Sequence, residues 1–181
     1  MKASQQDLAR QYLALAEHSL RRHHLPRIEY CLQQLTAKEI WWRPNAASNS
    51  AGNLALHLAG NVRQWIVSGL GGAPDFRRRD EEFAERGPLP RAQLIRGLRA
   101  AVRDACGVLR RLSADDLAKT RTIQKLQVTG LNAVQHVVEH FAFHSGQIIF
   151  ITKQSLNRDL GFIRFTGEKP HRRPRRRLPV L

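Results

Sequence analysis

Apolar residues recur about every 3.6 positions along most of this chain, which is the period of an α-helix that buries one face. Four stretches carry the pattern, at residues 5–35, 50–68, 91–112 and 132–154. Only residues 123–128 suit a strand or an extended loop. A chain of 181 residues can enclose one core of useful size. These features predict an all-α fold, a four-helix bundle around a single core.

The first stretch contains an apolar line and an internal proline. The spacing places Leu8, Tyr12 and Leu15 on the side that faces the core, with Ser19 continuing the line. Pro26 should kink or interrupt this helix, because proline lacks a backbone donor and its ring clashes with the preceding turn.

The connections that follow the second and third stretches are long. Residues 74–90 are rich in charges of both signs. A loop of this length is often a lid or the wall of a site, and disorder is the alternative. Long connections allow crossovers between helices, so the periodicity leaves the topology of the bundle open.

The sequence also bears on the protein's compartment. No run approaches the 18 apolar residues of a membrane-spanning helix, and the N-terminal residues lack the apolar core of a secretion signal. We therefore expect a cytoplasmic protein that does not engage a membrane. Cys31 and Cys106 are too few for a disulfide framework and wrongly spaced for a thiolate metal site, which indicates core thiols.

The chain is strongly basic, with 30 Lys and Arg residues against 15 Asp and Glu and a net charge of +15. Residues 167–181 hold six basic residues against one acidic residue, so we divide the chain into a bundle domain, residues 1–166, and a basic, flexible tail. A basic ridge on the third helix is formed by Arg96, Arg99, Arg103 and Arg110. Such a surface allows non-specific binding of nucleic acid, although a solvated helix face is the commoner outcome.

Three histidines lie four residues apart on the last helical stretch: His136, His140 and His144. His140 and His144 fall within the apolar stripe, so we expect them to face inward. A buried ring needs partners for its nitrogens, and an i,i+4 pair has the spacing to share one metal ion. One ion can take only adjacent members of the series, because His136 and His144 are about 12 Å apart along the axis. Core histidines bonded to other side chains are the alternative.

His57 on the second stretch is the obvious source of a third ligand. It forms an i,i+4 polar line with Asn53 and Asn61 at the edge of a leucine face. Taken alone, this line would be interpreted as a half-exposed polar border.

The chain nevertheless resembles a known superfamily. Two segments carry the resemblance: residues 52–65, GNLALHLAGNVRQW, and residues 136–148, HVVEHFAFHSGQI. They are similar to the DinB/YfiT-like superfamily of predicted metalloenzymes. Within it the chain looks like the DUF1572 group, through the motifs WWRPN at 41–45, EFAERGP at 82–88 and DLGF at 159–162. The resemblance covers nearly the whole chain up to about residue 165.

The resemblance implies a four-helix bundle with a non-meander topology, often found as a homodimer. It also implies a metal held by one histidine of the second helix and two residues an i,i+4 step apart on the last helix. By position these are His57, His140 and His144, and His136 is a neighbour one turn before the site. Ser145 stands where many relatives have Arg.

Three histidines would leave coordination positions open for water or substrate, as in catalytic sites. Nitrogen ligands suit Zn²⁺ or Ni²⁺ without choosing between them. Characterised members of the superfamily include thiol-dependent transferases, so the resemblance implies a metal-dependent S-transferase that joins a low-molecular-weight thiol to a small electrophilic substrate. Arg63, or Arg77 to Arg79, could bind the carboxylates of such a thiol, and Asn61 would lie near the site. Two alternatives stay open. One is hydrolysis by metal-activated water, and the other is a protein that binds nucleic acid or another anionic surface and uses the histidine cluster or its metal structurally.

Overall fold

The first helical stretch forms one long rod in three segments. In the computed structural model, which describes residues 4–162, the rod consists of α1 (Gln5–His18), the π-helical segment η1 (Ser19–His24) and α2 (Leu25–Gln34). Pro26 lies in the first turn of α2 and does not break the rod. The preceding π-turn accounts for this, because its wider hydrogen-bonding pattern accommodates a residue without a backbone donor.

The core-facing line of α1 differs from the predicted one. Leu8 and Leu15 are 56% and 68% exposed, whereas the buried residues of α1 are Ala9, Leu13 and Ala16. The buried face is therefore turned by about one residue. Two alanines on this face allow the helix to approach its neighbours closely, and alanine contributes little to a hydrophobic periodicity.

The other three rods agree with the predicted stretches to within a few residues. Ser50 caps the second rod through a capping box with Asn53. The remaining helices are α3 (Ala37–Trp41), α4 (Ala51–Val62) with its π-helical continuation η2 (Arg63–Ser68), α5 (Arg79–Ala84), α6 (Arg91–Leu109), α7 (Ala114–Ala118) and α8 (Gly130–Leu156).

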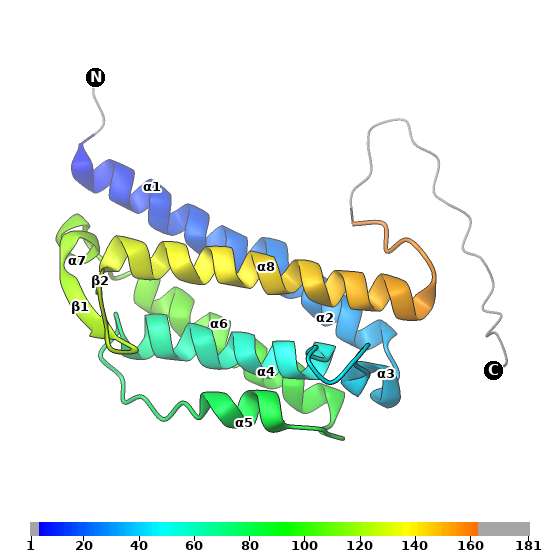
Figure 1. Cartoon of the computed structure of the whole chain (residues 1–181). Coiled ribbons are helices and arrows are strands. Elements are labelled where there is room, and N and C mark those ends of the chain that lie inside the picture. Colours follow the sequence, from blue (N-terminus) through cyan, green and yellow to red (C-terminus); the bar gives the residue numbers. More distant parts are fainter. Residues whose placement is uncertain (1–3, 163–181) are drawn as a thin grey trace, which may run out of the picture.

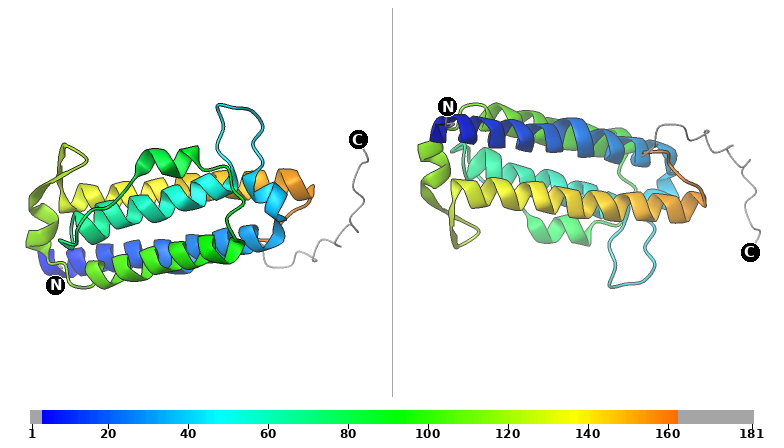
Figure 2. Two further views of the ribbon diagram at one scale, coloured as in Figure 1. Left: turned by 90° about the horizontal axis from the view of Figure 1, so that it is seen from below. Right: turned by 90° about the horizontal axis from the view of Figure 1, so that it is seen from above.

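The four rods pack as a bundle in which α4 lies between α6 and α8, and α2 contacts both α6 and α8 from the opposite side (Figures 1 and 2). Since α4 and α6 run in the same direction, the chain must return along the bundle between them (Figure 1). Residues 69–90 make this crossover, and α5 forms part of it on the outer side of α4 (Figure 2). We call residues 74–85 the strap. The expected long loop is thus an ordered segment that covers α4.

The second long connection is not a crossover of this kind. It stays at one end of the bundle and contains α7 and a hairpin of β1 (Thr120–Ile123) and β2 (Leu126–Thr129) (Figure 1). Gln124 and Lys125 form the turn with positive φ angles of 51° and 67°, the backbone of a two-residue hairpin loop. The extended stretch expected at residues 123–128 therefore comprises the last residue of β1, the turn and most of β2.

The core runs along the whole bundle and contains the two cysteines and two large aromatic side chains. Cys31 and Cys106 are buried free thiols, as predicted, and burial raises the pKa of Cys31 to about 11. Trp65 and Phe141 are buried between the rods. Among residues 4–162, no helix combines the length and apolarity that crossing a membrane requires.

We predict that acid destabilises this bundle partly through His24 in η1. Burial lowers the pKa of His24 to about 4, helped by the nearby His23 and Arg27. An unfolded histidine titrates near pH 6.5, so the unfolded chain binds more protons between these values. The free energy of unfolding should therefore be retained above about pH 6.5 and fall as the pH drops towards 4. Thermal denaturation from pH 7 to pH 4 measures this. The His24→Gln variant should lose part of the slope, and an unchanged slope would contradict the assignment.

Candidate metal centre

Two helices bring the predicted histidines together. The line of histidines on α8 faces α4, and His57 projects from α4 towards it. His57 is only 4% exposed, and His140 and His144 are half-buried. The prediction that His140 and His144 face inward is confirmed. The interpretation of the Asn53, His57 and Asn61 line as a half-exposed border is wrong, since all three side chains are buried.

The three rings converge on one small space. The Nε2 atoms of His57 and His140 are 2.8 Å apart, and the rings of His140 and His144 have centroids 4.3 Å apart. One nitrogen from each of His57, His140 and His144 lies within 4.8 Å of the others. This arrangement could hold a single metal ion.

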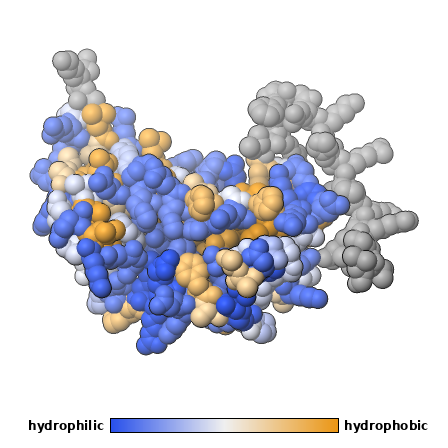
Figure 3. Space-filling view, in the orientation of Figure 1, coloured by the Kyte–Doolittle hydropathy of each residue, from blue (hydrophilic) through white to orange (hydrophobic). Residues whose placement is uncertain are grey.

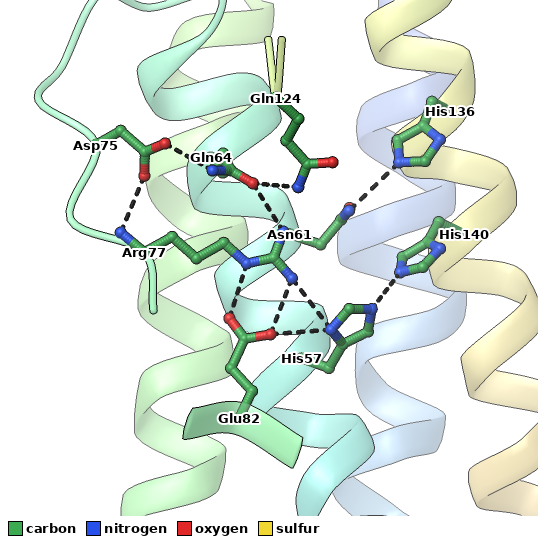
Figure 4. A network of polar contacts seen from close by, with 9 residues as sticks. All are labelled: His57, Asn61, Gln64, Asp75, Arg77, Glu82, Gln124, His136 and His140. Atoms are coloured by element: carbon green, nitrogen blue, oxygen red, sulfur yellow. Dashed lines mark hydrogen bonds and ion pairs between the residues drawn. The ribbon is translucent and has the colours of Figure 1, made fainter. Parts of the chain in front are cut away.

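The outer nitrogen of His57 meets the strap. Its Nδ1 is 2.9 Å from Oε2 of Glu82, a residue of α5 (Figure 4). A carboxylate only accepts hydrogen bonds, so it favours the tautomer in which Nδ1 carries the proton. The Nε2 lone pair of His57 then points towards His140, as metal ligation requires.

Arg77 holds Glu82 in this position. Its Nε and Nη2 donate to the two carboxylate oxygens at 2.8 and 2.9 Å, and its Nη1 donates to Gln64 at 2.9 Å (Figure 4). The Arg77 side chain is 3% exposed. Burial by itself would raise the pKa of Glu82, but the hydrogen bonds from Arg77 and His57 outweigh it and lower that pKa. The carboxylate is therefore ionised and paired at neutral pH.

The surface of α4 is shaped to receive the strap. The amide of Asn53 donates to the backbone carbonyls of Glu82 and Glu85, both at 2.9 Å. One turn beyond His57, a Cβ added at Gly60 would lie 1.9 Å from Oε1 of Glu82. Glycine at this position thus allows the close approach of the carboxylate.

His144 has a local partner for its outer nitrogen. Nδ1 of His144 is 2.6 Å from Oε1 of Gln147, one turn further along α8. Burial lowers the pKa of His140 to about 3, and the neighbouring His144 and His57 add to the shift. Burial also lowers the pKa of His144. The rings are consequently neutral at pH 7, which is the form that binds a metal.

His136 is a neighbour of this centre, as predicted. Its ring stacks on Trp65 with centroids 4.0 Å apart and lies 5.3 Å from the ring of His140. Nε2 of His136 is 3.3 Å from the amide nitrogen of Asn61 (Figure 4). The buried Oδ1 of Asn61 has no hydrogen-bond partner among residues 4–162. Asn61 thus lies beside the histidine line. Ser145, next to His144, is buried, and its hydroxyl finds no partner within the part of the chain that the structure describes.

The structure does not bring the other predicted arginines to the histidines. Arg63 contacts Asp104 on α6 at 3.4 Å, on another side of α4. Arg78 pairs with Glu81, and Arg79 lies over the ring of Phe83. Arg77 reaches the site, where it binds Glu82 and its Nη2 lies 3.1 Å from Nδ1 of His57. Glu82 was not predicted as a functional residue, although it begins the motif at residues 82–88.

The basic ridge on α6 is partly neutralised. Arg99 donates both ends of its guanidinium to Glu29 on α2 at 2.6 Å. Arg110 pairs with Glu17 on α1, and Arg103 pairs with Asp104. The predicted basic tail, residues 167–181, lies outside the residues that the structure describes. Ion pairs therefore join much of the ridge to the bundle, which weakens its case as a nucleic-acid surface.

Solved structures share this fold. A conserved protein of Enterococcus faecalis has a TM-score of 0.68 at 20% identity, over 80% of this chain and 97% of its own. A DinB-like protein from Bacillus cereus ATCC 10987 has a TM-score of 0.58 at 16% identity, over 74% of this chain and 87% of its own. This similarity confirms the predicted DinB-like helical bundle.

Sequence comparison gives the family. The family model described as a protein of unknown function, DUF1572, matches residues 7–170. The chain belongs to the DUF1572 family. No curated protein matches it. Membership of DUF1572 and the DinB-like fold both confirm the resemblance drawn from the motifs.

We predict that Gly60→Ala weakens the contact between the strap and α4 in this DUF1572 protein. The added methyl group would displace Glu82, and such overpacking costs about 1–3 kcal/mol of unfolding free energy. Gly97→Ala is the matched control, because Gly97 lies on the exposed face of α6 and its added Cβ meets nothing within 4 Å. That control should gain about 0.4–1 kcal/mol through reduced chain entropy. Chemical denaturation measures both, and equal gains would contradict the close approach.

Proposed function

We propose that this DUF1572 protein is a divalent-metal-dependent enzyme whose ion is held by His57, His140 and His144. One observation carries the proposal: three imidazoles from two helices converge, and the outer nitrogens of two of them bond to Glu82 and Gln147. Hydrogen bonds to the outer nitrogen fix the tautomer and ring orientation of a histidine that binds a metal. A pair of core histidines would not need this arrangement on both helices.

The donor set fits Zn²⁺ or Ni²⁺, since all three ligands are imidazole nitrogens. Three protein ligands leave a coordination position for a small molecule. A divalent ion there would lower the pKa of a bound thiol or water, so that it becomes a nucleophile at neutral pH.

Among these two nucleophiles we favour a low-molecular-weight thiol, which would be transferred to a small electrophile. The DinB-like fold supports this choice through the family resemblance. The protein's own contribution would be to orient the ligands through Glu82, Arg77 and Gln147 and to shield one side of His57 with the strap. The predicted arginines already contact other side chains in the structure: Arg63, and Arg77 to Arg79. We therefore do not assign the binding of the thiol to them.

We expect about one Zn²⁺ or Ni²⁺ per chain in protein produced with both metals available. His57→Ala, His140→Ala and His144→Ala should each lose most of this metal, because two imidazoles remain. His136→Ala is the matched control and should retain it, since His136 bonds to Asn61 and stacks on Trp65. Metal analysis by mass spectrometry measures this. Wild-type protein that contains no metal and takes up neither added ion would overturn the proposal.

The thiol is tested separately on the Co²⁺-substituted protein. Adding glutathione should produce a near-ultraviolet charge-transfer band of thiolate bound to cobalt, and this band should be absent in His144→Ala. A change in the visible cobalt spectrum without that band would reject direct thiol binding. Metal-activated water would then be the better choice of nucleophile.

A further inference from the structure

A groove of about 540 Å³ opens next to the candidate metal centre. It lies between the second half of α8 and the loop that joins α3 to α4. We call it the aromatic groove. Its lining includes Trp42, Pro44, Leu54, Phe143, Gln147 and Phe150. Its volume is in the range of small-molecule sites.

The aromatic groove shares a wall with the candidate metal centre. Gln147 lines the groove and is the residue that bonds to Nδ1 of His144. Phe143 also lines it, and its ring centroid is 5.2 Å from that of His144. On α4, Leu54 precedes His57 by about one turn. A molecule in the groove would therefore end about one helical turn from the imidazoles.

Among residues 4–162, the groove lining combines three aromatic rings with the polar side chains of Ser48, Asn49, Gln147 and Gln154, and it is uncharged. No residue that lines the groove carries a charged side chain, although the net charge of the chain is +15. Phe143 and Phe150 are 65% and 67% exposed at its rim. Figure 3 shows hydrophobic surface gathered along the second half of α8 and the seam beneath it. Exposed apolar clusters next to a concave surface are typical of binding sites.

A second pocket, of about 650 Å³, differs in that charged side chains line it. It lies between the strap and α4, and its lining includes Arg63, Arg78, Asp75 and Glu81. It reaches Glu82 and Arg77, which face the outer nitrogen of His57, while Nε2 faces His140. The aromatic groove therefore leads to the three histidines through uncharged residues, from the side of His144.

We propose that the aromatic groove binds the uncharged aromatic part of a small-molecule substrate and presents its reactive end to the metal centre. The absence of charge selects against ionic groups, and three aromatic rings offer stacking surfaces for a flat, apolar molecule. The inference rests on the proposed function for the chemistry that follows binding. Binding itself depends only on the groove.

The test uses N-phenyl-1-naphthylamine, a neutral aromatic dye whose fluorescence rises in an apolar site. We expect saturable binding of one dye per chain. Phe150→Ala should weaken it about tenfold, because one stacking face is lost. Phe76→Ala is the matched control, since Phe76 is also an exposed phenylalanine but lines the other pocket, and this variant should leave dye binding unchanged. Both side chains are exposed, so neither variant disturbs the core.

Co²⁺ adds a measure of proximity. Loading wild-type protein with Co²⁺ should quench the bound dye, and loading with Zn²⁺ should not. His144→Ala, which would lose the ion, should keep the dye bright. Dye binding without quenching in protein shown to contain Co²⁺ would overturn the placement beside the centre, even if the metal proposal holds.

Other results would overturn the groove itself. Unsaturable binding, or an equal loss in Phe76→Ala and Phe150→Ala, would show that the dye has no dedicated site there. If sedimentation shows a dimer that Phe150→Ala dissociates, and the wild type binds no dye, the groove is an interface between two copies. Protein that binds the dye as expected but takes up no Zn²⁺, Ni²⁺ or Co²⁺ would retain the site and reject its role as a substrate site of a metalloenzyme.

Discussion

The carboxylate of Glu82 meets the guanidinium of Arg77 and the imidazole of His57 in a space almost closed to water. Burying a single charge there would be costly, and removing one partner of such a pair leaves the other uncompensated. The pair is tolerated because each of its polar atoms has a partner, through Gln64 as well as His57. The strap therefore has one well-defined position on α4. The orientation of the His57 ring depends on that position.

This contact is a consequence of topology. Because α4 and α6 run in the same direction, the chain between them has to travel the length of the bundle on its outer side. In a simple up-and-down bundle a short turn would suffice at this point, and His57 would face solvent on its outer side. The crossover thus converts a surface histidine into a buried one. It also explains why α4 presents the amide of Asn53 and the small residue Gly60 to the strap.

Periodicity predicted the number, order and approximate limits of the long helices, because a helix that buries one face must repeat its apolar residues. It misplaced the face of α1, where Ala9 and Ala16 contribute to packing but scarcely to the pattern. The family resemblance predicted that His57 meets the α8 histidines. Spacing alone placed His57 at a polar border of its helix. Glu82 was beyond sequence reasoning for a different reason. It lies 25 residues from His57 in a charged loop, and only the path of the crossover brings the two together.

Gln147 and Glu82, which bond to the outer nitrogens of His144 and His57, reach their histidines in different ways. Gln147 reaches His144 within a single turn of α8, so that any formed stretch of this helix contains the pair. Glu82 reaches His57 only when the crossover has closed over α4. The partner of His144 is therefore determined by local helix formation, and the partner of His57 is determined by tertiary structure. An ion that requires all three rings would distinguish the native chain from a partly folded one, and its binding energy would add selectively to the stability of the closed form.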